Sequence, residues 1–208
     1  MDIRLTASAP NDTEKTVIDG AIRTLSKPES NDDLRPISTV GRVSIGGVAL
    51  VHKNRHKLLP VLQRVQDQIG WISAEAMGYI CERLGVPPAD AYGVASFYAL
   101  LSTEERPPRV AHVCDDIVCR RAGSFKICHE LKSQFGPSDQ SVDPLATWVT
   151  SPCLGLCDHA PAVLLQLAGE TDRIIPTADP GHVVRELKAT SENQKPNEYL
   201  SSVYTAVK

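Results

Sequence analysis

Two pairs of cysteines, each placed just after a predicted strand, constrain the fold of this 208-residue chain more than any other feature. Cys114 and Cys119 form the first pair, with four residues between them, and Cys153 and Cys157 form the second, with three. The 33 residues between the pairs are enough for one helix and one strand. Such a crossover returns the chain to the same end of a sheet, so the two cysteine loops are expected to lie side by side.

Four thiols in two pairs suit a 2Fe–2S cluster, in which each iron takes two protein sulfur ligands. The sequence therefore predicts one such cluster, held by Cys114, Cys119, Cys153 and Cys157. Gly155 gives the second loop the backbone freedom to curl around the sulfur atoms. Structural zinc also uses four cysteines, but its pairs are typically tighter, so the spacing favours iron and sulfide. Disulfides and unrelated core cysteines account less well for two matched pairs.

Charge and hydropathy argue against several other kinds of partner. The chain has 22 Lys and Arg against 25 Asp and Glu, so no basic surface for nucleic acid is expected. No run approaches the roughly 20 apolar residues needed to cross a bilayer, so direct membrane insertion is not expected. The first residues lack the basic start and apolar stretch of a secretory signal, which makes the cytoplasm the expected location.

The chain is expected to have an α/β (α+β) fold, with a small N-terminal helical bundle followed by a sheet domain. Residues 1–45 are expected to be a polar leader outside the core, either an arm that docks on a partner or a disordered tail. A short helix near residues 14–25 is compatible with the apolar spacing there. The helical subdomain is placed at 46–104, the cluster domain at 105–190, and a C-terminal tail at 191–208.

Hydrophobic periodicity and turn residues give the individual elements. Helices are predicted at 58–69, 73–84, 89–98, 121–135 and 180–187, and strands at 109–113, 145–150, 162–167 and 173–175. Ser73 is expected to cap the second helix, with Gly70 and Gly85 ending the first two. Phe97 and Phe125 are expected to face the core, although Phe97 can also line a face against a partner.

At three of these stretches the chain resembles a known family. The stretches are Gly70-Trp-Ile-Ser73, Tyr92-Gly-Val-Ala-Ser-Phe-Tyr98 and Cys153-Leu-Gly-Leu-Cys157-Asp-His-Ala-Pro161. Together with the first cysteine pair, they resemble the thioredoxin-like 2Fe–2S ferredoxins typified by the 24-kDa subunit of respiratory complex I. Relatives occur in NAD-linked hydrogenases and formate dehydrogenases, and the likeness covers roughly residues 56–190.

This resemblance implies a thioredoxin-like cluster domain with one 2Fe–2S cluster on the four cysteines. It also implies a flavoprotein subunit that binds FMN and NAD(H), together with further iron–sulfur and catalytic subunits. The chain itself would transfer electrons without catalytic residues of its own, in a formate dehydrogenase, a hydrogenase or complex I. The sequence has no Gly-x-Gly-x-x-Gly and no P-loop, which agrees with nucleotide sites on the partner. An assembly subunit with a structural cluster and a free-standing ferredoxin remain alternatives.

Overall fold

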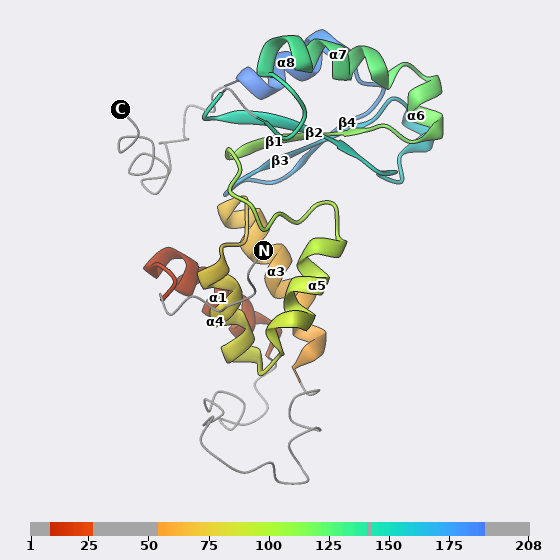
Figure 1. Cartoon of the computed structure of the whole chain (residues 1–208). Helices are drawn as coiled ribbons and strands as arrows, with labels where there is room; N and C mark the ends of the chain where they lie inside the picture. The colour runs from red at the N-terminus through yellow and green to blue at the C-terminus, as the bar shows by residue number, and fades with distance from the viewer. Residues whose placement is uncertain (1–8, 27–53, 141–142, 190–208) are drawn as a thin grey trace, which may run out of the picture.

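A computed structural model describes residues 9–26, 54–140 and 143–189 of the chain. Figure 1 shows a group of helices below a sheet, with further helices covering the far face of that sheet. None of the described helices is long and apolar enough to cross a membrane. The predictions made for residues 27–45 and for the tail at 191–208 fall outside the described residues.

The N-terminal helices share one apolar core. They are α1 (Asp12–Leu25), α3 (Leu58–Ile69), α4 (Ala74–Leu84) and α5 (Pro88–Phe97), with a short 3-10 helix η1 (Arg55–Lys57) before α3. Fully buried side chains from these helices include Ile18, Val61, Leu62, Ile80 and Leu84. Their burial removes apolar surface from water and holds the helices together.

The predicted ends of α3 and α4 are confirmed by their backbone geometry. The Ser73 hydroxyl accepts a hydrogen bond from the Ala76 N–H at the start of α4. Gly70 and Gly85 end α3 and α4 with φ of 94° and 66°, in the left-handed region that favours glycine.

The expectation that the leader lies outside the core is wrong for residues 12–25. These residues form α1, whose Ile18 and Ile22 are 0% and 5% exposed within the helical core. A capping box fixes the start of α1, because the Asn11 side chain accepts from the Glu14 N–H and the Glu14 carboxylate accepts from the Asn11 N–H. The Glu14 carboxylate also accepts from the Ser73 hydroxyl at 2.5 Å, which ties α1 to the start of α4.

The second half of the described chain forms a four-stranded mixed sheet with the order β2-β1-β3-β4. The strands are β1 (Arg109–Cys114), β2 (Ala146–Ser151), β3 (Val163–Leu167) and β4 (Arg173–Ile175). β1 and β2 are parallel, whereas β3 is antiparallel to both β1 and β4. The predicted crossover between the cysteine pairs and the predicted β3–β4 hairpin are therefore confirmed.

Helices α7 (Ser124–Phe135) and α8 (Pro180–Lys188) lie side by side on one face of this sheet (Figure 1). They bury Ile127, Leu131, Phe135, Val183 and Leu187 against the strands. The prediction of one helix over 121–135 is corrected, because the chain forms a short α6 (Ile117–Arg121) and then turns at Gly123, whose φ is 101°. A final 3-10 turn, η2 (Cys157–His159), follows the second cysteine pair.

Two aromatic side chains expected in the core are exposed. Phe125 is 59% exposed because α7 starts only after Gly123, which turns Ser124 and Ile127 inward in its place. Phe97 is 80% exposed because α5 packs on its neighbours through the small residues Ala91 and Ala95.

His112, in the middle strand β1, is fully buried on the sheet face opposite α7 and α8. Its Nε2 lies 2.7 Å from the Gln166 Oε1, and its Nδ1 has no hydrogen-bond partner among the described residues. Burial lowers the pKa of His112 from 6.5 to about 4, and the Gln166 hydrogen bond opposes this only in part. The imidazole is therefore neutral in the folded protein at physiological pH.

Folding should consequently weaken in mild acid. Below pH 6.5 the unfolded chain binds a proton at His112, whereas the folded chain does not until about pH 4. Between pH 7 and pH 5.5 we expect the wild type to lose about 1 kcal/mol of unfolding free energy relative to His112→Gln, which does not titrate. Urea unfolding of both proteins at the two pH values measures the loss of unfolding free energy. Equal losses in both proteins would contradict the lowered pKa of His112 in the folded chain.

Candidate functional site

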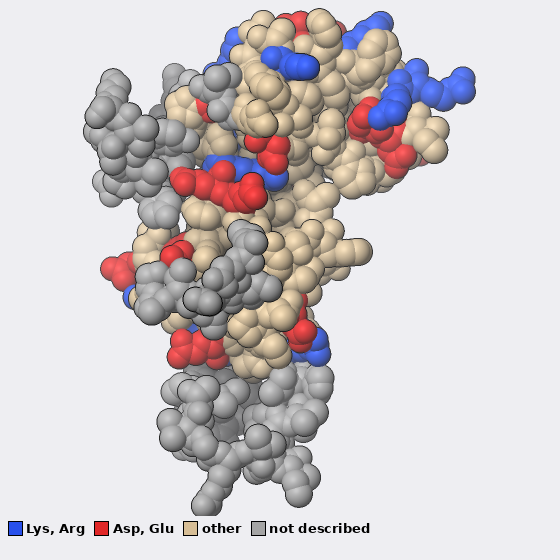
Figure 2. Space-filling view, in the orientation of Figure 1, with Lys and Arg blue, Asp and Glu red and all other residues tan. Residues whose placement is uncertain are grey.

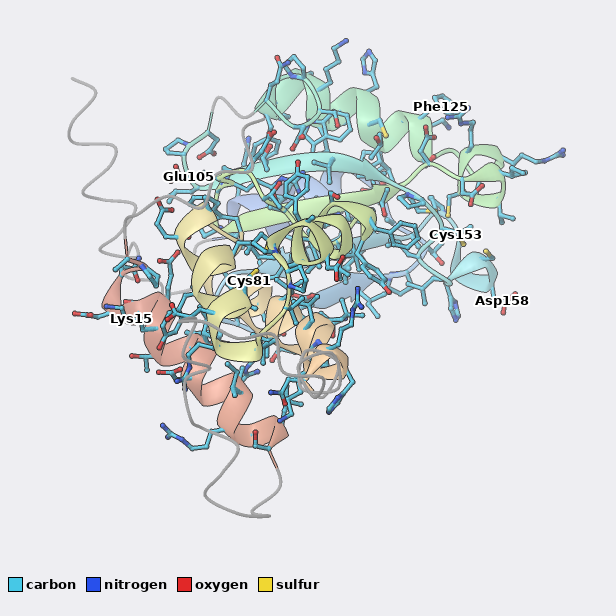
Figure 3. The ribbon with its side chains drawn as sticks, turned by 60° about the horizontal axis from the view of Figure 1, so that its bottom comes forward. Lys15, Cys81, Glu105, Phe125, Cys153 and Asp158 are labelled. Carbon is cyan, nitrogen blue, oxygen red and sulfur yellow. The ribbon has the colours of Figure 1, made fainter. Side chains whose placement is uncertain are left out.

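The sheet brings the two predicted cysteine loops together. Cys114 is the last residue of β1 and pairs in register with Ser151, the last residue of the parallel strand β2. The Asp115 N–H donates to the Ser151 carbonyl at 3.0 Å, so the two chains stay joined as they leave the sheet. Cys153 follows Ser151 by two residues and lies at this end of the sheet domain (Figure 3).

The first pair forms the buried side of the site. Cys114 and Cys119 are each 2% exposed, and Cys119 is held within α6. The start of α6 is fixed by Asp116, whose carboxylate accepts from the Ile117 N–H at 2.7 Å. The short helix thus returns Cys119 toward Cys114 immediately after the strand ends.

Side chains of the second loop pack directly on the first pair. Cys114, Cys119 and Ala162 form a small apolar cluster, and the partly buried Leu154 and Leu156 pack against it. The prediction that the two loops lie side by side is confirmed by this packing. The contribution of Leu154, Leu156 and Ala162 to the site was not predicted, although the alternation in Cys-Leu-Gly-Leu-Cys gives a signal for two of them.

The second pair forms the exposed side of the site. The Sγ atoms of Cys153 and Cys157 lie 3.5 Å apart, and both residues are exposed. The Gly155 N–H donates to the Cys153 Sγ at 3.4 Å, with the glycine φ at 76°. The loop thus uses the backbone freedom of glycine, since another residue would be strained in that conformation. That Gly155 lets the loop curl around the sulfide ions of a cluster stays a prediction.

Two of the four thiols, those of Cys119 and Cys157, have raised pKa values. Burial raises the pKa of Cys119, a hydrogen bond from the Ala162 backbone opposes this, and neighbouring Cys114 and Cys157 raise it further. The hydrogen bond with Cys153 and the charge of Cys153 raise the pKa of Cys157. The charge of Cys114 raises the pKa of Cys157 further. Since these effects cross between the pairs, the two pairs are close. As thiolates they would repel one another unless a cationic group lay between them.

The nearby cation Arg120 does not offset this repulsion between thiolates, because its guanidinium is paired with Asp115. The Arg120 Nε donates to the Asp115 carboxylate at 3.0 Å, and its Nη2 also contacts this carboxylate. This pairing holds the pKa of Asp115 below its ordinary value. The thiols are therefore left as a donor set suited to a soft metal.

The donors are arranged in pairs. In the part of the chain that the structure describes, no group of three or more His, Cys, Asp or Glu side chains is close enough together to hold a metal ion. The thiols lie as two pairs on adjacent loops, an arrangement that suits two metal ions bridged by further atoms. The donor set thus fits a 2Fe–2S cluster.

The remaining cysteines differ in position and chemistry. Cys81 lies in the helical core, far from Cys153 (Figure 3), and burial raises its pKa to about 11. It is therefore an unreactive packing residue. Cys128 is half-buried on α7, and burial raises its pKa as well.

Comparison with known proteins identifies the family. Residues 47–183 match the family model described as thioredoxin-like 2Fe–2S ferredoxin. One relative, a component of the NADH-quinone oxidoreductase from Pseudomonas aeruginosa, is 34% identical over 109 residues, which cover 51% of this chain and 66% of that protein. Its counterpart from Escherichia coli is 31% identical over 109 residues, with the same coverage. The match thus spans just under two thirds of the length of these relatives.

A solved structure of an NAD+-reducing NiFe hydrogenase in the air-oxidized state is also similar, with 21% identity and a TM-score of 0.48. The structural match covers 83% of this chain and 26% of the hydrogenase chain. The family model alone extends over well more than half of the sequence, including all four candidate ligands. The chain belongs to the thioredoxin-like 2Fe–2S ferredoxin family.

Proposed function

We propose that this chain is the electron-transfer subunit of a multisubunit NAD-linked oxidoreductase and holds one 2Fe–2S cluster. Its ligands would be Cys114, Cys119, Cys153 and Cys157. The observation that carries the proposal is the placement of two thiol pairs on adjacent, mutually packed loops, one pair buried and the other exposed. The names of the relatives, subunits of NADH-quinone oxidoreductase, support an NADH-linked parent complex. The proposal also includes a formate dehydrogenase or a hydrogenase as the parent complex. We propose the cytoplasm as the location of the chain.

The protein's own contribution is to hold and shield the ligands. Cys114 and Cys119 anchor the inner side, where Leu154 and Leu156 exclude water. The Gly155 N–H is positioned to donate to sulfur, which stabilises negative charge there. When bound, the cluster supplies reversible one-electron transfer.

The exposed side would be the side that the partner covers. Cys153 and Cys157 face solvent here, and Ile117 and Val118 on α6 are 75% and 45% exposed. Figure 2 shows a notch below this part of the sheet domain, bordered mostly by uncharged surface. Contiguous exposed apolar residues mark interaction sites, so we place the FMN- and NAD(H)-binding flavoprotein subunit on this side.

Anaerobic expression and metal analysis test the proposal directly. We expect about two iron and two sulfide ions per chain and an EPR signal after reduction by dithionite. NADH alone should not reduce the chain, whereas NADH with the flavoprotein subunit of its parent complex should. A chain that holds one zinc ion and no sulfide would contradict the cluster. A loaded chain that binds the flavoprotein but is never reduced through it would favour the alternative of an assembly subunit.

The partner surface can be tested with the same reduction assay. Phe97, at the end of α5, stacks edge to face on Tyr98 with ring centroids 5.2 Å apart and stays 80% exposed. We expect Phe97→Ala to leave cluster content unchanged but to weaken flavoprotein binding about tenfold, as for an aromatic hot spot. Ile174→Ala is the matched control, because Ile174 is also exposed, at 56%, but lies on the edge strand β4. Equal affinities for both variants would exclude the α5 end from the interface.

A further inference from the structure

The helical group has a large groove that the proposed function does not use. It lies between α1 and α3, has a volume of about 550 Å³, and is lined by residues that include Val17, Gly20, Leu25, Pro60 and Arg64. Leu25 is 39% exposed, and a Cβ added at Gly20 would meet nothing within 4 Å. Its lining is mixed, because Thr16, Thr24, Arg64 and Gln68 lie among the apolar residues. A groove of this size and mixed lining between two helices is the kind of surface that binds another amphipathic helix.

The described chain ends at the same end of the sheet as a turn that contacts α3. The Arg109 guanidinium donates to the carbonyl of Ala189, which places the last described residue beside the start of β1. The strand next to it, β3, ends in a turn whose Gly169 N–H donates to the Asp67 carbonyl of α3 at 2.8 Å. The next residue, Gln68, lines the groove. In Figure 1 the end of α8 and the helix α1 lie on the same side of the molecule.

Residues 190–208, which continue from this point, carry an amphipathic pattern. Leu200, Val203, Tyr204 and Val207 recur at the i, i+3, i+4, i+7 spacing of one helix face, with Ser202 and Thr205 opposite. As a helix, residues 199–207 would extend about 14 Å, close to the length of α1 from Thr16 to Leu25. The preceding residues 190–198 can span up to about 30 Å.

We propose that residues 199–207 dock as a helix in the α1–α3 groove, with Leu200 and Val203 against Gly20 and Leu25. The tail would enter beside Gln68 and run toward the end of the groove at Pro60. This direction follows because α1 and α3 are antiparallel, as the 3.1 Å contact between Lys57 Nζ at the start of α3 and Ser26 Oγ at the end of α1 indicates.

The other segment outside the described residues fits the groove less well. Residues 27–53 also begin beside the groove, at its Leu25 end, but their apolar residues do not show the same spacing. Val43 and Ile45 alternate with polar residues, a period that suits a strand rather than a helix in a groove. The tail proposal concerns no cluster ligand and stands independently of the electron-transfer function.

Photo-cross-linking in the full-length, cluster-loaded chain tests the proposal. We expect a benzophenone amino acid at Gly20 to cross-link, within the same chain and independently of dilution, to the peptide that contains residues 199–207. The matched control is the same amino acid at Gly93, a helical glycine on α5 with equally open surroundings, which should not reach the tail. Cross-links from position 20 only to residues 27–53, only to a second copy, or to nothing would overturn the proposal.

Two double variants then test the apolar face of the tail. We expect Leu200→Asp with Val203→Asp to abolish the cross-link, and Ser202→Asp with Thr205→Asp to retain it. Amide hydrogen exchange in the same full-length variants provides a second measurement, and α1 should exchange about tenfold faster in the first than in the second. A cross-link that survives Leu200→Asp with Val203→Asp, or equal exchange in the two variants, would overturn the assignment of this face.

Discussion

Replacing Cys119 with serine is expected to reduce the iron and sulfide content of the anaerobically purified chain to less than about a tenth of the wild-type value. Cys119 is 2% exposed and packed with Cys114 and Ala162, so little room exists for water or another side chain to take its place. A serine hydroxyl is a hard, weakly acidic donor, poorly matched to iron bridged by sulfide. Iron and sulfide analysis, with EPR of the reduced protein, measures the loss.

Cys128→Ser is the matched control for this substitution. Cys128 is half-buried on the neighbouring helix α7 and lies outside the two pairs, so its replacement should leave iron content and the EPR signal unchanged. Full iron content in Cys119→Ser would remove Cys119 from the ligand set. Loss in Cys128→Ser would add a fifth thiol to the site.

Truncation of Ile18 to alanine is expected to destabilise the protein by about 3 kcal/mol. Ile18 on α1 is 0% exposed and packs in the same core as Val61 and Leu62 of α3, so removal of its methyl groups leaves a cavity. Denaturant unfolding followed by circular dichroism measures the change, which should be independent of cluster content if both proteins are fully loaded.

Thr13→Ala provides the control on the same helix. Thr13 is exposed, so its replacement should change the unfolding free energy by no more than about 0.5 kcal/mol. An Ile18→Ala variant as stable as Thr13→Ala would show that α1 contributes nothing to the helical core, and would restore the interpretation of residues 12–25 as a leader.

The sequence predicted the sheet and its crossover because spacing alone carries that information. The strand that ends at Cys114, followed by a helix and a second strand before Cys153, forms a crossover that brings both strand ends to the same edge of the sheet. The pairing of Cys114 with Ser151 realises this arrangement. The roles of Ser73, Gly70 and Gly85 were equally predictable because helix ends depend on local hydrogen bonds and backbone conformation.

The errors arose where packing overrides periodicity. The apolar spacing of Val17, Ile18 and Ile22 predicts a helix, but only contact with α3 and α4 makes it part of the core. On α7, a left-handed glycine at position 123 starts a new helix and moves Phe125 to the surface. The sequence shows that a residue is apolar, whereas its burial depends on a partner elsewhere in the chain.

The position of the thiols at one end of the sheet has a consequence for the chain's tolerance of change. The connection from α7 to β2 begins at Gly136, at the opposite end of the strands, where Trp148 Nε1 donates to the Gly136 carbonyl. Extra residues inserted there would lengthen a surface loop, and the β1–β2 register would still fix where each sulfur sits. Loop length can thus vary at this edge without moving the four thiols at the other.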